Sequence, residues 1–333
     1  MKIIIPMAGA GKRMRPHTHT TPKPLIPIAG KPIVQWLVED IIKVCKDKVT
    51  EIVFVIGDFG KEAENNLLKI AESEGAKGRI CYQDEALGTA HAILCAKESL
   101  TGKVVIAFAD TLFRADFTMD EDKDGVIWVS KIEDPRAFGV VKFNKENIIT
   151  DFVEKPQTFV SDLAIIGIYY VKDGDNLRKE MQYLIDNNIK EKGEYQLTNA
   201  LENMKNKGMK FVPGKVDEWL DCGNKDATVY TNKRVLEIHK NTKMISSTLK
   251  KNNAVVVEPC YIGEDVVITN SVVGPYVSIG SKTSIEGSVI TNSIIQSNSK
   301  VRNALMDNSM IGNFVEYNGK VNDLSIGDHS VQK

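Results

Sequence analysis

After residue 254 the chain repeats an aliphatic residue every five or six positions. Ser, Asn, Gly and Thr fill many of the positions between. This spacing matches neither the 3.6-residue period of an α-helix nor the alternation of a simple strand. Hexapeptide repeats of this kind build a left-handed parallel β-helix, in which the aliphatic residues of successive coils stack inward. We therefore predict such a β-helix over 254–333. Its predicted inward positions are Ile262, Ile268, Val273, Ile279, Ile285, Ile290, Ile295, Val301, Met306 and Ile311.

The sequence before this repeat has the pattern of an α/β domain. A chain of 333 residues exceeds the usual size of one hydrophobic core, so two domains are expected. A helical stripe over 33–46, a buried strand over 51–57 and an amphipathic helix over 61–71 alternate. This alternation predicts a Rossmann-like, mixed but mainly parallel sheet that binds ligands at the carboxyl ends of its strands. We place this domain at 1–240 and a polar linker at 241–253. Further short strands are expected over 125–132, 138–143, 148–154 and 164–171.

A glycine loop follows the first apolar strand directly. Gly9 and Gly11 allow the backbone to approach an anion, and their loop N–H groups can point at it. The cations of this segment are Lys12, Arg13, Arg15 and Lys23. A Walker loop is excluded because Arg13 stands where it needs Ser or Thr, and the dinucleotide fingerprint is excluded because Met14 replaces its third glycine. The loop is therefore predicted to bind phosphate in another way.

Composition restricts the partners of the chain. The net charge of −1 gives no general attraction to nucleic acid or to anionic lipid, so neither partner is expected. The five cysteines lack Cys-x-x-Cys spacing. This spacing argues against a zinc site and favours free thiols in the reducing cytoplasm.

The motifs G-x-G-x-R, P-K-P, E-K-P and W-x-D-x-G occur in this order and are followed by the hexapeptide repeat. Together they resemble the sugar-nucleotide pyrophosphorylases, which are nucleoside triphosphate:sugar-1-phosphate nucleotidylyltransferases. The resemblance implies that the loop of Ala8, Gly9 and Gly11 wraps a triphosphate. It also implies that Arg13 grips the leaving pyrophosphate and that Lys23 acts on phosphate. Ala8 departs from the family pattern, which often has glycine there.

The segment around Gln83 resembles the base-reading element of that family, with Gly88 and Thr89 beside the base. A carboxamide offers one donor and one acceptor, which fits the N3–H and O4 edge of uracil or thymine. A flipped carboxamide would fit cytosine equally well. The expectation of dTTP or UTP therefore rests on the resemblance, which favours a glucose-1-phosphate thymidylyltransferase over a uridylyltransferase.

For the sugar phosphate, the resemblance assigns Glu154 to the sugar hydroxyls and Lys155 to the phosphate. Gly139 would permit close approach of the sugar. Ile165 and Tyr169 fall where the family lines its sugar pocket, although alternating apolar residues of a strand are usually core.

Two aspartates are predicted to hold Mg²⁺. Asp110 follows an apolar strand expected over 103–109, and Asp221 belongs to the W-x-D-x-G motif. A carboxylate at a buried strand end needs compensation, which magnesium bound to a triphosphate can provide. The resemblance implies this pair as the metal ligands.

Other interpretations remain open from the residues alone. A GTP-dependent mannose-1-phosphate guanylyltransferase shares much of the architecture, and a catalytically silent regulatory subunit could have the same fold. The β-helix also builds acyltransferases, but only one histidine, His329, lies in this part of the sequence. We expect the β-helix to serve as an oligomer interface. The segment over 193–199 resembles the family's E-x-x-L-T-D, and we assign it no chemistry.

Overall fold

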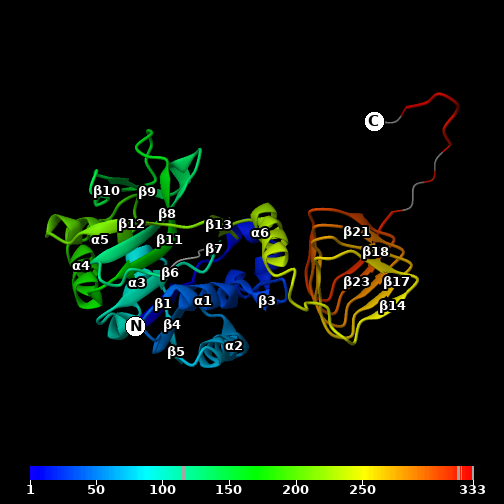
Figure 1. Cartoon of the computed structure of the whole chain (residues 1–333), viewed down its shortest axis with the longest axis horizontal. Coiled ribbons are helices and arrows are strands. Elements are labelled where there is room, and N and C mark those ends of the chain that lie inside the picture. The colour runs from blue at the N-terminus through cyan, green and yellow to red at the C-terminus, as the bar shows by residue number, and fades with distance from the viewer. Residues whose placement is uncertain (115–117, 321–322, 324, 332–333) are drawn as a thin grey trace. The chain divides into compact units, whose positions relative to one another are not determined.

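The computed structural model describes residues 1–114, 118–320, 323 and 325–331 (Figure 1). The chain forms two compact units. The first contains Met1–Ile26 and Pro32–Gly223, and the second contains Pro27–Lys31 and Asn224–Lys333. The expected end of the α/β domain at residue 240 and the expected start of the β-helix at residue 254 stay predictions.

A nine-stranded sheet organises the first unit. Its centre is parallel: β1 lies between β4 and β6, and β5 pairs with β4. The parallel strands are β1 (Lys2–Pro6), β4 (Glu51–Ile56), β5 (Lys77–Tyr82) and β6 (Val104–Ala107). On the other side β11 runs antiparallel to β6, β8 and β9. The remaining strands are β8 (Gly125–Lys131), β9 (Gly139–Phe143), β10 (Ile149–Glu154), β11 (Leu163–Val171) and β12 (Phe211–Lys215). The predicted mixed, mainly parallel Rossmann-like sheet is confirmed.

Both faces of this sheet are buried, and helices pack against them. On one face, apolar side chains of α3 (Thr89–Leu94), α4 (Gly174–Asp186) and α5 (Leu197–Asn206) share a core with Ile4 and Val53. The alternate residues Ile3 and Phe54 are also fully buried, and successive strand side chains point to opposite faces. α2 (Gly60–Ser73) contacts β4 and β5, and α1 (Ile33–Val44) contacts the short strand β7 (Thr111–Arg114).

The strand predicted over 103–109 ends earlier than expected. β6 stops at Ala107, and the chain turns through Phe108 before β7 (Thr111–Arg114) pairs with β13 (Glu218–Asp221). The Phe108 N–H donates to the carbonyl oxygen of Gly167, and the Thr111 N–H donates back to that of Phe108. Asp110 therefore lies in a turn between two strands, where its side chain reaches a cavity.

The second unit contains a β-helix whose coils stack in three parallel sheets. The first sheet comprises β14 (Lys250–Asn252), β17 (Val267–Thr269), β20 (Ser284–Glu286), β23 (Lys300–Arg302) and β26 (Glu316–Asn318). The second comprises β15 (Val255–Val256), β18 (Val272–Val273), β21 (Val289–Ile290) and β24 (Leu305–Met306). The third comprises β16 (Tyr261–Ile262), β19 (Ser278–Ile279), β22 (Ile294–Ile295) and β25 (Met310–Ile311). This arrangement is that of the predicted left-handed β-helix.

The predicted aliphatic positions form the core of the β-helix. They stack in register, for example Ile262 on Ile279 and Ile279 on Ile295. Nearly all of them are buried, while Met306 and Ile311 near the end of the helix are partly buried. Asn253 and Asn270 lie at one corner with positive φ, which asparagine tolerates better than most residues, and their side chains hydrogen-bond to each other at 2.9 Å.

One face of the β-helix is covered within its own unit. Asn232 is a buried residue of the helix α6 (Lys225–Ile238). Its Oδ1 accepts hydrogen bonds from the Ser278 hydroxyl at 2.6 Å and from the Ala29 N–H at 2.9 Å. Ala29 lies between the short strands β2 (Pro27–Ile28) and β3 (Lys31–Pro32). Among the described residues, none of the helices combines the length and apolar character needed to cross a bilayer.

Candidate active site

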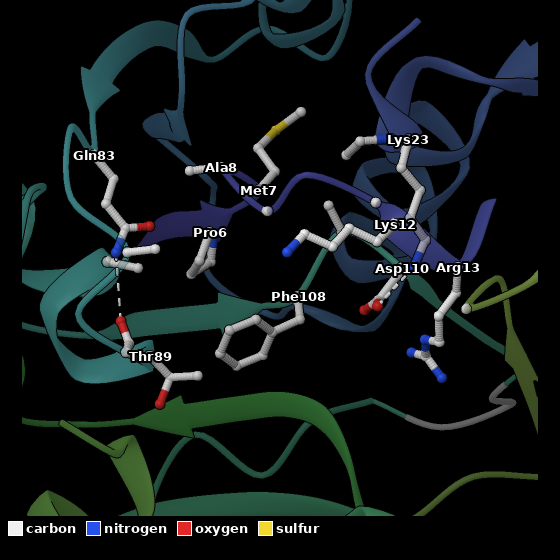
Figure 2. A pocket seen from close by; sticks show the side chains of 18 of the residues that line it. Pro6, Met7, Ala8, Lys12, Arg13, Lys23, Gln83, Thr89, Phe108 and Asp110 are labelled. Carbon is white, nitrogen blue, oxygen red and sulfur yellow. Dashed lines mark hydrogen bonds and ion pairs between the residues drawn. The ribbon is translucent and has the colours of Figure 1, made fainter. Parts of the chain in front are cut away.

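Two adjoining cavities lie in the first unit beside the loop that follows β1. The first cavity, of about 440 Å³, is lined by the glycine loop and by Gln83 and Gly88 (Figure 2). The second cavity, of about 270 Å³, is lined by Glu154, Lys155 and the middle of β11. Both are lined by Arg13, Thr89, Phe108 and Asp110. The two cavities therefore meet at a charged boundary.

Every residue to which the family resemblance assigns a place in the site lines one or both cavities. The first is lined by Ala8, Gly9, Gly11, Arg13, Lys23, Gln83, Gly88, Thr89 and Asp110. The second is lined by Arg13, Thr89, Asp110, Gly139, Glu154, Lys155, Ile165, Tyr169 and Asp221. Segments far apart in the chain are thus brought together, although the role of each side chain stays a prediction.

The glycine loop has a shape that only small residues permit. Gly11 has a φ of +58°, and a Cβ there would lie 2.9 Å from the Cγ2 of Thr18. The Thr18 hydroxyl donates to the Gly11 carbonyl oxygen at 2.9 Å, so the following segment folds back on the loop. Nothing lies within 4 Å of the position that a Cβ on Gly9 would take, so the backbone there is open to a ligand.

Lys23 and Asp110 form an ion pair at the boundary of the two cavities. The Lys23 Nζ lies 2.8 Å from the Asp110 Oδ2, with the lysine side chain 10% exposed and the aspartate 41% exposed. Figure 2 shows the two side chains pointing toward each other, with Arg13 close by. An anionic ligand can share Lys23 with Asp110, or can take the lysine once a cation occupies the carboxylate.

Asp221 belongs to the same cluster of charges. Its pKa is raised above the usual value chiefly because burial penalises the ionised carboxylate, and also because Asp110 repels it. Lys23 and Arg13 act in the opposite direction. Gly223 leaves room between these groups, since a Cβ there would lie 2.8 Å from an Asp221 carboxylate oxygen and 3.1 Å from a guanidinium nitrogen of Arg13.

The two aspartates fit a magnesium ion. They repel each other and one is partly desolvated, so a divalent cation between them would relieve both costs. Within the described ranges, no group of three or more His, Cys, Asp or Glu side chains could hold a metal by itself. Magnesium commonly uses one or two carboxylates together with substrate phosphates, so two are enough.

Gln83 lies at the far end of the first cavity, after β5. Its backbone N–H donates to the Ile56 carbonyl oxygen at 2.8 Å, which places it at the carboxyl edge of the sheet. Gly88 has a φ of +119°, and a Cβ there would lie 2.5 Å from the Tyr195 carbonyl oxygen. Glycine is therefore required where this loop packs against Tyr195.

The second cavity is lined by two neighbouring residues that form an ion pair, Glu154 and Lys155, and by buried side chains. The Lys155 Nζ lies 3.6 Å from the Glu154 Oε1, and the Thr198 hydroxyl donates to the Glu154 Oε2 at 3.2 Å. A Cβ on Gly139 would lie 3.1 Å from that same carboxylate. Ile165 and Tyr169 are 5% and 6% exposed, so they serve as core residues as well as cavity walls.

The segment over 193–199, to which the sequence assigned no chemistry, borders both cavities. Glu194 lines the first cavity, and Gln196 and Thr198 line the second. The Thr89 hydroxyl donates to the Gln196 side-chain oxygen at 3.1 Å and accepts from the Leu197 N–H at 2.9 Å. The likeness to E-x-x-L-T-D was the available signal, but no local pattern says that this segment docks on the loop before α3.

Comparison with known proteins identifies the family. Residues 2–238 match the model of the nucleotidyl transferase family. The low-salt glycan biosynthesis nucleotidyltransferase Agl11 of Haloferax volcanii is 26% identical over 90% of this chain and 89% of that protein. A glucose-1-phosphate thymidylyltransferase of Streptomyces antibioticus is 26% identical over 99% of this chain and 98% of that protein.

The bifunctional protein GlmU of Methanococcus maripaludis is 31% identical over 76% of this chain, which covers 58% of that longer relative. Among solved structures, a UDP-glucose pyrophosphorylase with UDP-glucose matches with a TM-score of 0.58 at 22% identity, over 71% of this chain and 98% of the other. That likeness shows the shared fold. The match over 2–238 covers the unit that carries both cavities. The chain therefore belongs to the nucleotidyl transferase family and is an enzyme of sugar-nucleotide synthesis.

Proposed function

We propose that this protein transfers a nucleotidyl group from dTTP or UTP to glucose 1-phosphate and releases pyrophosphate. The observation that carries the proposal is the pair of adjoining cavities that share Arg13 and Asp110. One cavity has a phosphate-type glycine loop and a carboxamide at its far end, and the other has Glu154 and Lys155. Two substrates bound in this way would meet with their phosphates at the charged boundary.

The proposed reaction is an in-line displacement without a covalent enzyme intermediate. A phosphate oxygen of the sugar 1-phosphate attacks the α-phosphorus, its new P–O bond forms, and the bond to the pyrophosphate oxygen breaks. The nucleophile is already anionic, so the reaction needs no general base. The task of the protein is then positioning and charge neutralisation. Arg13 would stabilise the leaving pyrophosphate, Lys23 the α-phosphate and Lys155 the attacking phosphate.

Magnesium held by Asp110 and Asp221 would neutralise charge on the phosphate oxygens. The raised pKa of Asp221 and the repulsion from Asp110 support this assignment. Lys23 would then be free to turn from Asp110 to the ligand.

The nucleobase is proposed to bind beside Gln83. The cavity there is bounded by the Gly88 loop, and the carboxamide oxygen of Gln83 can accept a hydrogen bond from the N3–H of uracil or thymine. Thymine differs from uracil by one methyl group, which changes binding by only about 1–3 kcal/mol, so both triphosphates are proposed.

The test is pyrophosphate release with dTTP, UTP, CTP, GTP and ATP, each against glucose, N-acetylglucosamine, galactose and mannose 1-phosphates, with and without magnesium. Magnesium-dependent release with dTTP or UTP and glucose 1-phosphate is the expected result. Release confined to GTP and mannose 1-phosphate would replace the proposal with the guanylyltransferase alternative. No release with any pair, together with no triphosphate binding by calorimetry, would favour a catalytically silent regulatory subunit.

We also propose that copies of the chain associate through the second sheet of the β-helix. Its outward positions form a ladder of exposed aliphatic residues, Val255, Val272, Val289 and Leu305, which are 56%, 39%, 45% and 87% exposed. They stand in register on neighbouring coils. The first sheet instead presents outward charges such as Lys300 and Glu316, which pair at 2.7 Å. Light scattering should show an oligomer that the double variant V272K/V289K converts to monomer, whereas S284K on the first sheet should not. A wild-type monomer would refute this interface.

All five cysteines have free thiols. This state supports the proposal that the protein works in the reducing cytoplasm.

A further inference from the structure

The carboxamide nitrogen of Gln83 has two hydrogen-bond partners. Its Nε2 lies 3.2 Å from the Nδ1 of His91 and 3.5 Å from the Gly88 carbonyl oxygen. Figure 2 shows the bond to the backbone as a dashed line and the side-chain oxygen on the side of the cavity. The same Gly88 oxygen also accepts from the Ala92 N–H at 3.0 Å. Carbonyl oxygens accept only, so this partner fits the NH₂ end of the carboxamide.

His91 strengthens this orientation when its Nδ1 accepts. It lies in α3, one helical turn after Gly88, and is half-buried. With the ring proton on Nε2, the lone pair of Nδ1 faces the Gln83 NH₂ group. A carboxamide turned by 180° would instead set its oxygen against the Gly88 carbonyl oxygen, and also against the Nδ1 lone pair as long as the ring proton of His91 stays on Nε2. An imidazole nitrogen accepts in one tautomer and donates in the other, so the preference that the shorter contact to His91 adds depends on the Nε2–H tautomer.

The orientation matters because it decides which pyrimidine edge fits. With Nε2 engaged by His91 and Gly88, the Oε1 is left as an acceptor for a ligand donor. Uracil and thymine have a donor at N3–H, whereas cytosine has an unprotonated acceptor nitrogen at N3. The two bases also differ at C4, which carries a carbonyl oxygen in uracil and an amino group in cytosine, and the nucleotides are otherwise the same. The orientation of one carboxamide beside N3 can therefore discriminate between them. A site that leaves buried polar groups unpaired rejects the wrong partner strongly.

We propose that His91, in the tautomer that carries its ring proton on Nε2, is a positioning residue that acts with the Gly88 carbonyl oxygen to set the orientation of the Gln83 carboxamide and thereby selects uracil-type bases over cytosine. This inference rests on the proposed function, because it assumes that Gln83 meets the base. His91 acts through Gln83, and it is absent from the lining of either cavity.

The test measures dissociation constants for UTP and CTP, with magnesium and without sugar phosphate, by calorimetry. These probes share the ribose and triphosphate and differ at the base edge. H91L removes the acceptor and keeps an apolar side chain of similar reach. H91N keeps an acceptor, because the asparagine Oδ1 can occupy the place of the histidine Nδ1. Thermal unfolding checks the fold of each variant, and H91F is the second acceptor-free variant if the leucine variant does not fold.

The wild type should bind UTP more tightly than CTP. In H91L the ratio of the two constants should fall by about tenfold, and in H91N it should return to within about threefold of the wild type. A merely structural role would weaken both nucleotides together and leave the ratio unchanged.

An unchanged ratio in a folded acceptor-free variant overturns the inference while leaving the proposed function in place. A wild type that does not distinguish UTP from CTP also overturns it, even if pyrophosphate release occurs. Failure of the wild type to bind either pyrimidine triphosphate would overturn the proposed substrates together with the inference.

Discussion

The two cavities are built from different kinds of structure. The first is lined largely by loops, namely the glycine loop after β1 and the turn from Gln83 to Thr89. The second is lined by β9, β10 and β11, with walls such as Ile165 and Tyr169 that also belong to the core. A cavity made of loops can adjust when a ligand binds, and its cations can change partners. A cavity made of packed strands is largely formed in advance.

We therefore expect the two cavities to have different tasks in the proposed reaction. The loops supply the charges that bind the triphosphate, and Lys23, which pairs with Asp110 in the free protein, can be shared with the ligand or taken by it. The strands supply the shape that holds the second substrate, with Glu154 already oriented by Thr198. Substitutions on the first side should therefore lower turnover, and substitutions on the second should mainly weaken binding of the sugar phosphate.

The largest effect is expected for R13A. Removing the guanidinium at the boundary should lower kcat by at least ~10²-fold, or about 3 kcal/mol of barrier, because the leaving pyrophosphate loses a charge partner. R15A is the matched control, since Arg15 is an exposed neighbour absent from the lining of either cavity. Near-normal turnover in R13A would remove Arg13 from the mechanism.

D221N should separate activity from stability. Because the pKa of Asp221 is raised, its ionised carboxylate destabilises the folded state. This destabilisation is present above that pKa and is lost as the pH falls through it. Asparagine removes the charge, so the unfolding temperature near neutral pH should rise by a few degrees. Turnover should fall by about 10²-fold through loss of magnesium binding. A lower unfolding temperature in the variant would contradict the predicted cost of the buried charge.

The same raised pKa predicts how the wild type responds to acid. Asp221 retains its proton at higher pH than an ordinary aspartate, and a proton competes with the metal. The magnesium concentration for half-maximal rate should increase as the pH is lowered toward that pKa. A requirement that is constant over this range would argue against Asp221 as a ligand.

K155A should act on the second substrate alone. The KM for the sugar 1-phosphate should rise by about tenfold or more, while binding of the triphosphate without sugar stays the same, because a charge-assisted contact to one phosphate is lost. K142A, an exposed lysine of the neighbouring strand β9, provides the control. An equal loss for both substrates would break the proposed division between the cavities.

The smallest effect is expected for T198V. Valine keeps the shape but removes the hydrogen bond to Glu154, which is worth about 0.5–1.5 kcal/mol. The KM for the sugar phosphate should therefore rise about two- to tenfold with little change in kcat. A change in kcat alone would show that Thr198 acts on the reaction step instead.

Local patterns in the sequence predicted much of the fold and many of the residues that line the cavities. The period of five or six residues predicted the stacked ladders of the β-helix because every coil repeats the same local geometry. The alternation of strand and helix predicted the sheet, and short motifs predicted residues that line both cavities. Each of these features is written in neighbouring residues or in a fixed repeat.

Tertiary structure decided what the local patterns do not contain. The Tyr195 N–H donates to Leu87 and the Ala90 N–H donates to Tyr195, so the segment over 193–199 docks on the turn before α3. Only that docking makes Glu194 and Gln196 part of the site, and only the start of α3 brings His91 to Gln83. The sequence by itself determined the repeat, the sheet and the positions of the charged motifs. The folded chain decided which distant groups share a cavity, because this depends on packing between segments far apart in the chain.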